Sequence, residues 1–194
     1  MALGLNWYRA DLRELSFLLL EQFKLADLVG RPPFEAWGPE EAKSVLRETY
    51  RFAREVLGPL NAPADRGGCR LVDGRVVTPP GFPDAWRQLY ENGFKSLGVH
   101  PDHGGQGAPA MLSVLVEEML SGSNPAFAMY PGLAFGAAEL LLECGTQEQV
   151  KTYADRMFNG TWGGTMCLTE PQAGSDVGAA TTTAQKQPDG SYRI

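Results

Sequence analysis

The sequence is poor in residues that bind metals or form disulfides. Its 3 cysteines, Cys69, Cys144 and Cys167, lie far apart and form no C-x-x-C pair, so neither a disulfide framework nor a zinc site is indicated. The two histidines, His100 and His103, lie close together. Proline and glycine place them in a loop, and a third ligand is lacking. We therefore expect free thiols in a reducing compartment and no metal.

Basic residues are also in deficit. Lysine and arginine number 17 against 23 aspartates and glutamates, which gives a formal net charge of -6. Binding to a nucleic-acid backbone needs a basic surface, so we expect no nucleic-acid partner. A small anionic ligand is not excluded, because it needs only a local group of hydrogen-bond donors.

Long hydrophobic runs are scarce near the N-terminus. The longest apolar cluster there, residues 17–20, falls far short of the ~20 residues that cross a bilayer, and no basic-then-apolar signal pattern precedes it. Residues 126–144 are almost wholly apolar, but they contain Pro131 and Gly132 and look too short for a span. We predict that they form a helix buried on all sides. A cytoplasmic protein without a membrane span is expected.

The first two thirds of the chain show helical periodicity. We predict a helix over residues 11–28, and a second helix that starts at Pro39 and is closed by Gly58-Pro59. The expected buried stripes are Leu12, Leu15, Leu19, Phe23 and Ala26 in the first helix, and Ala42, Val45, Thr49, Phe52 or Ala53, and Val56 in the second.

The later segments alternate turns with further periodic stretches. A hairpin is predicted over residues 70–77 with Asp73-Gly74 as its turn. Helices are predicted over residues 83–92, 109–121, 125–144 (capped by Asn124) and 146–158. From residue 161 the character of the sequence changes, and we expect strands over 162–169 and 181–185 and near Tyr192. The fold class is therefore mainly α: a helical domain followed by the first strands of a truncated sheet domain.

The segment from Thr169 to Ser175 carries the chemistry. The predicted strand that ends at Thr169 would present main-chain donors and acceptors to a flat polar ring. Pro171 forces Glu170 towards an extended conformation, so we expect the chain to turn sharply away from the strand there. Ala173, Gly174 and Ser175 then remove side-chain bulk, so that backbone N–H groups can approach an anion. This suits a dinucleotide, although the same residues also make purely structural turns.

This segment resembles the signature of the acyl-CoA dehydrogenase family in Cys167-Leu168-Thr169-Glu170-Pro171-x-Ala173-Gly174-Ser175-Asp176. Residues 97–107, 145–149 and 159–162 also resemble family segments. The resemblance implies an N-terminal helical extension over 1–36, the family's N-terminal α-domain over 37–160, and an incomplete middle β-domain over 161–194. The extension and the residues near 76–82 and 127–133 are similar to the larger members, the subgroup of 3-methylmercaptopropionyl-CoA dehydrogenases.

The resemblance implies that FAD is the cofactor. Main-chain groups around Leu168 and Thr169, and the Thr169 hydroxyl, would contact the flavin ring. Gly174 and Ser175 would lie near the pyrophosphate, and Ser175 would also meet the acyl-CoA. The implied cofactor-binding residues are Met166, Cys167, Leu168, Thr169, Gly174 and Ser175.

The implied reaction is α,β-dehydrogenation of an acyl-CoA, with an electron-transferring flavoprotein as acceptor and a homodimer or homotetramer as the assembly. In the family the catalytic glutamate comes from a C-terminal domain beyond Ile194. No catalytic residue is therefore assigned here, Glu170 is given a structural role, and residues 1–194 alone are expected to be inactive. Alternatives are an acyl-CoA oxidase, a non-catalytic or nucleic-acid-associated relative, and a stand-alone helical interaction module.

Several other side chains invite a role. Phe127, Met129, Tyr130 and Phe135 could wall an acyl tunnel, but aromatic and apolar residues at helical spacing usually fill cores, and we expect core packing for most of them. The pair Glu117 and Glu118 is expected only to solvate the exposed side of its helix.

Overall fold

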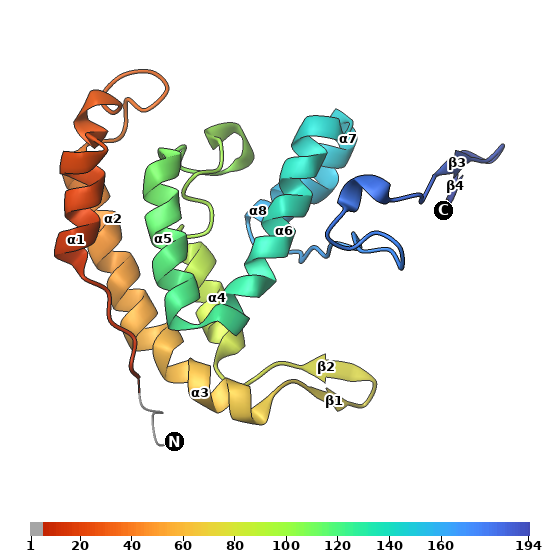
Figure 1. The fold of residues 1–194 in the computed structure, drawn as a ribbon, viewed down its shortest axis with the longest axis horizontal. Coiled ribbons are helices and arrows are strands. Elements are labelled where there is room, and N and C mark those ends of the chain that lie inside the picture. Colours follow the sequence, from red (N-terminus) through yellow and green to blue (C-terminus); the bar gives the residue numbers. More distant parts are fainter. Residues whose placement is uncertain (1–5) are drawn as a thin grey trace. The chain divides into compact units, whose positions relative to one another are not determined.

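The computed structural model describes residues 6–194, so the first five residues of the predicted extension lie outside the described part. It is mainly helical, as predicted (Figure 1). The chain divides into two compact units, residues 6–164 and 165–194, and each is described by itself. The division falls four residues after the predicted end of the helical domain at 160.

The N-terminal helix is shorter than predicted. It consists of α1 (Leu12–Phe17) and a π-helical turn (Leu18–Gln22), and a 3-10 turn (Leu25–Asp27) follows. Lys24 has a φ of 49°, in the left-handed region, and this breaks the helix. The break shifts the phase of the side chains, so that Leu25 is buried whereas Phe23 and Ala26, predicted on the buried stripe, are exposed.

The predicted end of the second helix at Gly58-Pro59 is wrong. α2 (Pro39–Phe52) continues through a π-helical turn (Ala53–Leu57) into α3 (Gly58–Gly67). Gly58 keeps a right-handed helical φ of -59°, and proline is tolerated in the first turn that follows. The buried line also differs by one residue, with Leu46 and Leu57 buried where Val45 and Val56 were expected.

The hairpin and the next helix are as predicted. β1 (Arg70–Val72) pairs antiparallel with β2 (Arg75–Val77), and α4 (Phe82–Glu91) follows. Asp73 and Gly74 have φ values of 49° and 74°. Positive φ at both central residues is what a type I′ hairpin turn requires.

The long apolar helix is not buried on all sides, contrary to the prediction. α6 (Pro125–Cys144) packs against α5 (Ala110–Ser123), and Phe127 and Ala134 are buried. Ala138 is buried in a second, smaller cluster with Ala154 and Phe158 of the last helix. The side of α6 opposite these residues is open. Its bounds are those predicted, but the segment is not too short for a span as expected: by length and composition its 20 residues could cross a membrane. The core helices of soluble proteins pass the same test.

The helices of residues 6–164 lie side by side in the order α1, α2, α5, α6 (Figure 1). The last helix, predicted over 146–158, is present as α7 (Gln147–Gln149), a π-helical turn (Val150–Ala154) and α8 (Asp155–Phe158), and it packs on α6. The side chains of Leu46, Leu112, Met119 and Phe127 belong to one continuous core. Packing of these helices holds α6 by its buried side.

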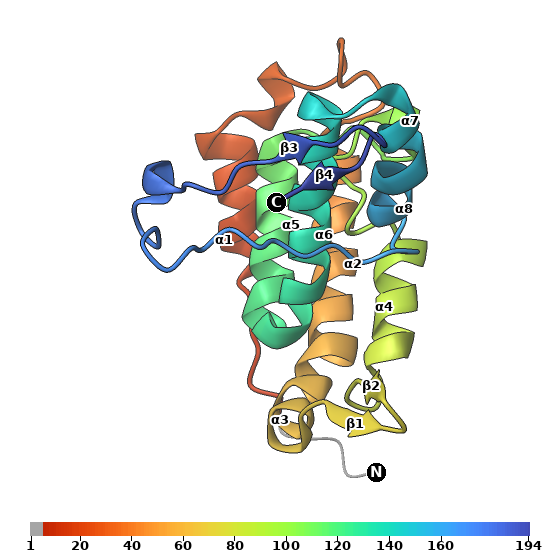
Figure 2. The same ribbon diagram turned by 90° about the vertical axis from the view of Figure 1, so that its right-hand side faces the viewer.

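Residues 165–194 contain less strand than predicted. Within the described residues, 162–169 form no strand, and β3 (Gln185–Lys186) pairs only with β4 (Tyr192–Arg193) (Figure 2). A strand is stabilised by hydrogen bonds to a neighbouring strand, and among the described residues none pairs with 162–169. The prediction of a strand over 162–169 is therefore wrong for this chain.

Candidate functional site

Met166 and the first three residues of the signature have main-chain groups that make no hydrogen bond. Met166, Cys167, Leu168 and Thr169 are all exposed. Among the described residues, none of their N–H or C=O groups makes a hydrogen bond within the protein. Consecutive unpaired main-chain donors and acceptors are able to bind the polar edge of a flat ring, and such binding does not require the side chains.

A closed turn joins these residues to the second half of the signature. Glu170 N–H donates to Ala173 O and Ala173 N–H donates to Glu170 O, both at 3.1 Å. Thr169 and Gly174 therefore flank one turn, and Ser175 follows at once. The N–H groups of Gly174 and Ser175 have no acceptor within the described chain, and a Cβ placed at Gly174 would meet open space.

Glu170 has the structural role that the sequence predicted. Its carboxylate accepts hydrogen bonds from Thr181 N–H at 2.9 Å and Thr182 N–H at 3.0 Å, and another from the side-chain amide of Gln172. The hydrogen bonds from these threonines, Thr181 first, lower the pKa of Glu170 to about 2. A carboxylate that is ionised and fully engaged is a poor general base near neutral pH. Sequence reasoning missed the two threonines, because they lie outside the motif.

This arrangement suits the ring and the pyrophosphate of a flavin dinucleotide. Residues 166–169 offer hydrogen-bonding groups to a ring, and residues 174–175 offer N–H groups and no bulk to a phosphate. The turn at Glu170 keeps the two sets next to each other in the chain. The residues present therefore fit FAD by their donor chemistry.

The exposed side of α6 is a second candidate surface. Met129, Leu133 and Leu140 lie on one line of the helix, opposite the buried line, and are exposed by 67%, 41% and 63%. Core packing was expected for most of the four side chains Phe127, Met129, Tyr130 and Phe135. This is confirmed for Phe127, which is buried, but not for Met129 or Tyr130, which are exposed. An apolar line this exposed is able to contact an apolar ligand or another part of a protein.

Glu117 does more than solvate its helix. Its carboxylate forms an ion pair with Lys95, whose side chain is only 8% exposed, and the ammonium also lies 5.1 Å from the centre of the Phe135 ring. Both residues line a cavity of about 420 Å³ between α5 and α6. The expectation for Glu117 is therefore wrong, whereas Glu118 is exposed as expected.

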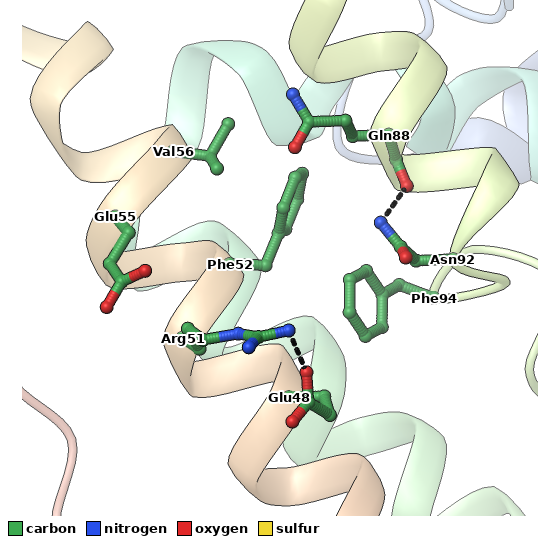
Figure 3. Close-up of a pocket in the computed structure, with 8 residues that line it drawn as sticks. All are labelled: Glu48, Arg51, Phe52, Glu55, Val56, Gln88, Asn92 and Phe94. Carbon is green, nitrogen blue, oxygen red and sulfur yellow. Dashed lines mark hydrogen bonds and ion pairs between the residues drawn. The ribbon is translucent and has the colours of Figure 1, made fainter.

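A further pocket of about 340 Å³ lies between α2 and α4 (Figure 3). Phe52 and Phe94 form its floor, with their ring centres 5.2 Å apart. The pair of Arg51 and Glu48 lies on its rim. Of the ionised groups that line it, Glu48 and Arg51 pair with each other at the surface.

The histidines do not form a metal site. His103 Nδ1 lies 2.9 Å from Asp155 Oδ1, and this contact ties the loop 101–103 to α8. His100 is exposed and lies beside Asp102. Over residues 6–194, no group of three or more potential metal ligands occurs.

Comparison with known sequences matches the chain to one family. Residues 39–161 match the model of the acyl-CoA dehydrogenase N-terminal domain. The 3-methylmercaptopropionyl-CoA dehydrogenase of Ruegeria pomeroyi is 34% identical over 96% of this chain, and the broad-specificity linear acyl-CoA dehydrogenase FadE5 of Mycobacterium tuberculosis is 34% identical over 98%. The chain spans 32% and 31% of these relatives, about a third of their length.

Solved structures share the fold. Butyryl-CoA dehydrogenase from Megasphaera elsdenii matches 78% of this chain and 38% of its own with a TM-score of 0.61 and 22% identity. An acyl-CoA dehydrogenase from Bacillus anthracis, solved with FAD, matches 84% of this chain and 26% of its own with a TM-score of 0.60 and 27% identity. The chain therefore belongs to the acyl-CoA dehydrogenase family, and its helices form that family's N-terminal domain.

Proposed function

We propose that the protein containing this chain is an FAD-dependent acyl-CoA dehydrogenase that introduces an α,β double bond into an acyl thioester. The observation that carries the proposal is the row of unpaired main-chain groups in residues 166–169 and 174–175. They occur in a chain of the acyl-CoA dehydrogenase family, and one matched relative was solved with FAD.

Each half of the signature has its own part in holding the cofactor. Main-chain groups of Leu168 and Thr169, with the Thr169 hydroxyl, would bind the polar edge of the flavin, and Met166 and Cys167 would line it. Gly174 and Ser175 N–H groups would bind the pyrophosphate, and Ser175 would also contact the acyl-CoA. When bound, FAD would be the oxidant that accepts the β-hydrogen as a hydride, with its two electrons.

The exposed line of α6 would serve as one wall for the acyl chain. Met129, Leu133 and Leu140 are apolar, exposed and spaced along one side of a rigid helix. Burying such side chains against a hydrocarbon chain is favourable by about 25 cal/mol per Å² of apolar area. The names of the matched relatives, which include a broad-specificity linear acyl-CoA dehydrogenase, agree with an acyl substrate but do not fix its length.

No residue of this chain is proposed as the catalytic base. Glu170 is the only acidic residue of the signature before Asp176, and its carboxylate is committed to Thr181, Thr182 and Gln172. The α-proton would be removed by a glutamate outside residues 1–194. We therefore expect residues 1–194 alone to lack turnover.

The compartment, the electron acceptor and the assembly belong to the same proposal. The three cysteines are unpaired and exposed, which suits a reducing compartment such as the cytoplasm. An electron-transferring flavoprotein is the proposed acceptor and a homodimer or homotetramer the proposed assembly. The net charge of -6 does not favour the nucleic-acid-associated alternative.

The test is performed on the polypeptide as its whole gene encodes it. FAD is titrated into the apoprotein, and acyl-CoA is then added without oxygen while the flavin absorbance is followed. Bleaching of the bound flavin together with formation of an enoyl-CoA is the expected result. Failure to bind FAD would refute the proposal, and bleaching by acyl-CoA with residues 1–194 alone would refute the assignment of the base to a residue outside them.

A further inference from the structure

Glu170 holds together a loop that carries both halves of the proposed cofactor site. Its Oε1 accepts from Thr182 N–H, and its Oε2 accepts from the N–H and the hydroxyl of Thr181, at 2.9 and 3.2 Å. These residues lie 11 and 12 positions further along the chain. The carboxylate therefore closes the loop that contains Gly174 and Ser175.

Gln172 strengthens the same closure from inside the loop. Its side-chain amide donates both to the Glu170 carboxylate and, at 2.9 Å, to the Thr181 hydroxyl. The main-chain bonds between Glu170 and Ala173 fix the turn itself. Glu170 is thus held by its backbone on one side of the loop and by its side chain on the other.

We propose that Glu170 is a positioning residue, whose ionised carboxylate closes the loop 170–182 before the cofactor binds and so sets the N–H groups of Gly174 and Ser175 in place for the pyrophosphate. The proposal rests on the proposed function. It assigns no contact between Glu170 and the cofactor. Within residues 165–194 the only regular pairing is the short hairpin β3–β4, so the regular strands of this unit do not hold the loop.

Closing the loop before the cofactor binds lowers the conformational entropy that is lost on binding. An open loop must be ordered when its ligand binds, and that cost is subtracted from the affinity. Fixing the backbone of even one residue corresponds to about a factor of ten in affinity. We therefore expect loss of the closure to weaken FAD binding about tenfold or more.

Two substitutions separate the charge from the shape. Glu170→Ala removes the acceptor, and Glu170→Gln keeps the volume but turns an NH2 group towards an N–H donor. If the carboxylate closes the loop, both variants lose FAD affinity to a similar extent. If the side chain only fills space, Glu170→Gln behaves like the wild type. Glu143→Gln is the control, because the Glu143 side chain is exposed and makes no hydrogen bond or ion pair in the described chain.

The experiment measures two quantities in the protein as its gene encodes it. One is the Kd for FAD, and the other is hydrogen exchange at the Thr181 and Thr182 amides in the apoprotein. Helix content by circular dichroism checks that residues 6–164 remain folded. In both Glu170 variants we expect faster exchange and a Kd raised about tenfold or more, with Glu143→Gln unchanged.

The outcomes are distinguishable. A wild-type protein that does not bind FAD refutes the proposed function, and this inference fails with it. If the wild type binds FAD and either Glu170 variant binds equally tightly, the inference alone is overturned. Unchanged amide exchange at Thr181 and Thr182 in the variants would likewise overturn the inference alone.

Discussion

Replacing Asn124 tests how α6 is joined to the start of α3. Asn124 is fully buried. Its Oδ1 accepts the hydrogen bond from Phe127 N–H at 3.1 Å and so caps α6, while its Nδ2 donates at 3.2 Å to Leu57 O, at the junction of the π-helical turn and α3. One amide therefore satisfies polar groups of two helices that are 67 residues apart in sequence.

The cost of Asn124→Ala follows from these two bonds. Loss of an N-cap costs about 1 kcal/mol. Leu57 is the N-cap residue of α3, so its carbonyl also faces the first turn of that helix, and loss of the Asn124 donor removes one further hydrogen bond worth about 0.5–1.5 kcal/mol. The free energy of unfolding should therefore fall by about 1.5–2.5 kcal/mol. Asn124→Asp keeps the cap acceptor but loses the donor and buries a charge, which raises the pKa of the new carboxyl, so its stability should recover as the pH is lowered.

Urea denaturation followed by circular dichroism measures these effects. Asn92→Ala is the matched control, because Asn92 also donates its amide to a backbone carbonyl but is exposed, and it should cost less than about 0.5 kcal/mol. The slope of the transition should stay constant. If Asn124→Ala is as stable as the control, the two hydrogen bonds do not join α3 and α6 as described.

Three further predictions concern the ion pair, the glycine loop and the signature turn. Glu117→Gln leaves the buried Lys95 ammonium without a counter-charge and should cost about 1–3 kcal/mol in urea denaturation, less than for a fully buried pair because Glu117 is 41% exposed. Gly105→Ala would place a Cβ 2.0 Å from a backbone carbonyl oxygen and should lower Tm more than Gly104→Ala, which meets only the strain of a φ of 79°. The pKa of Glu170 is depressed to about 2, so its stabilising contribution is present above its ordinary pKa and is lost only as the pH falls through about 2. NMR shifts of its partner amides should therefore be constant from about pH 8 to 4, and a transition in that interval would contradict the hydrogen bonding described.

Local chemistry could be predicted because it depends on neighbours in sequence. The hairpin turn at Asp73-Gly74 and the cap at Asn124 are where the sequence placed them. The helix over 146–158 is also found, with Thr146 completing a capping box. These features need only a few adjacent residues to satisfy backbone groups or to adopt a positive φ.

Two errors concern where a helix ends, and a third concerns a contact between residues distant in sequence. The periodicity of residues 11–28 continues past Lys24, but the helix stops there. Gly58-Pro59 is typical of a helix end, yet the chain stays helical through it. Glu117 has the pattern of a surface charge, although the loop that brings Lys95 to it lies 22 residues earlier in the chain.

The sequence by itself determined the helical class, the turns and caps, and the family signature from Cys167 to Asp176, because each is written in residues that are near neighbours. Only the tertiary structure decided that α6 is buried along one side and open along the other, since helices distant in sequence cover that one side. It also decided that Glu170 is occupied by Thr181 and Thr182. A carboxylate's role depends on which donors reach it, and that is settled by the path of the folded chain.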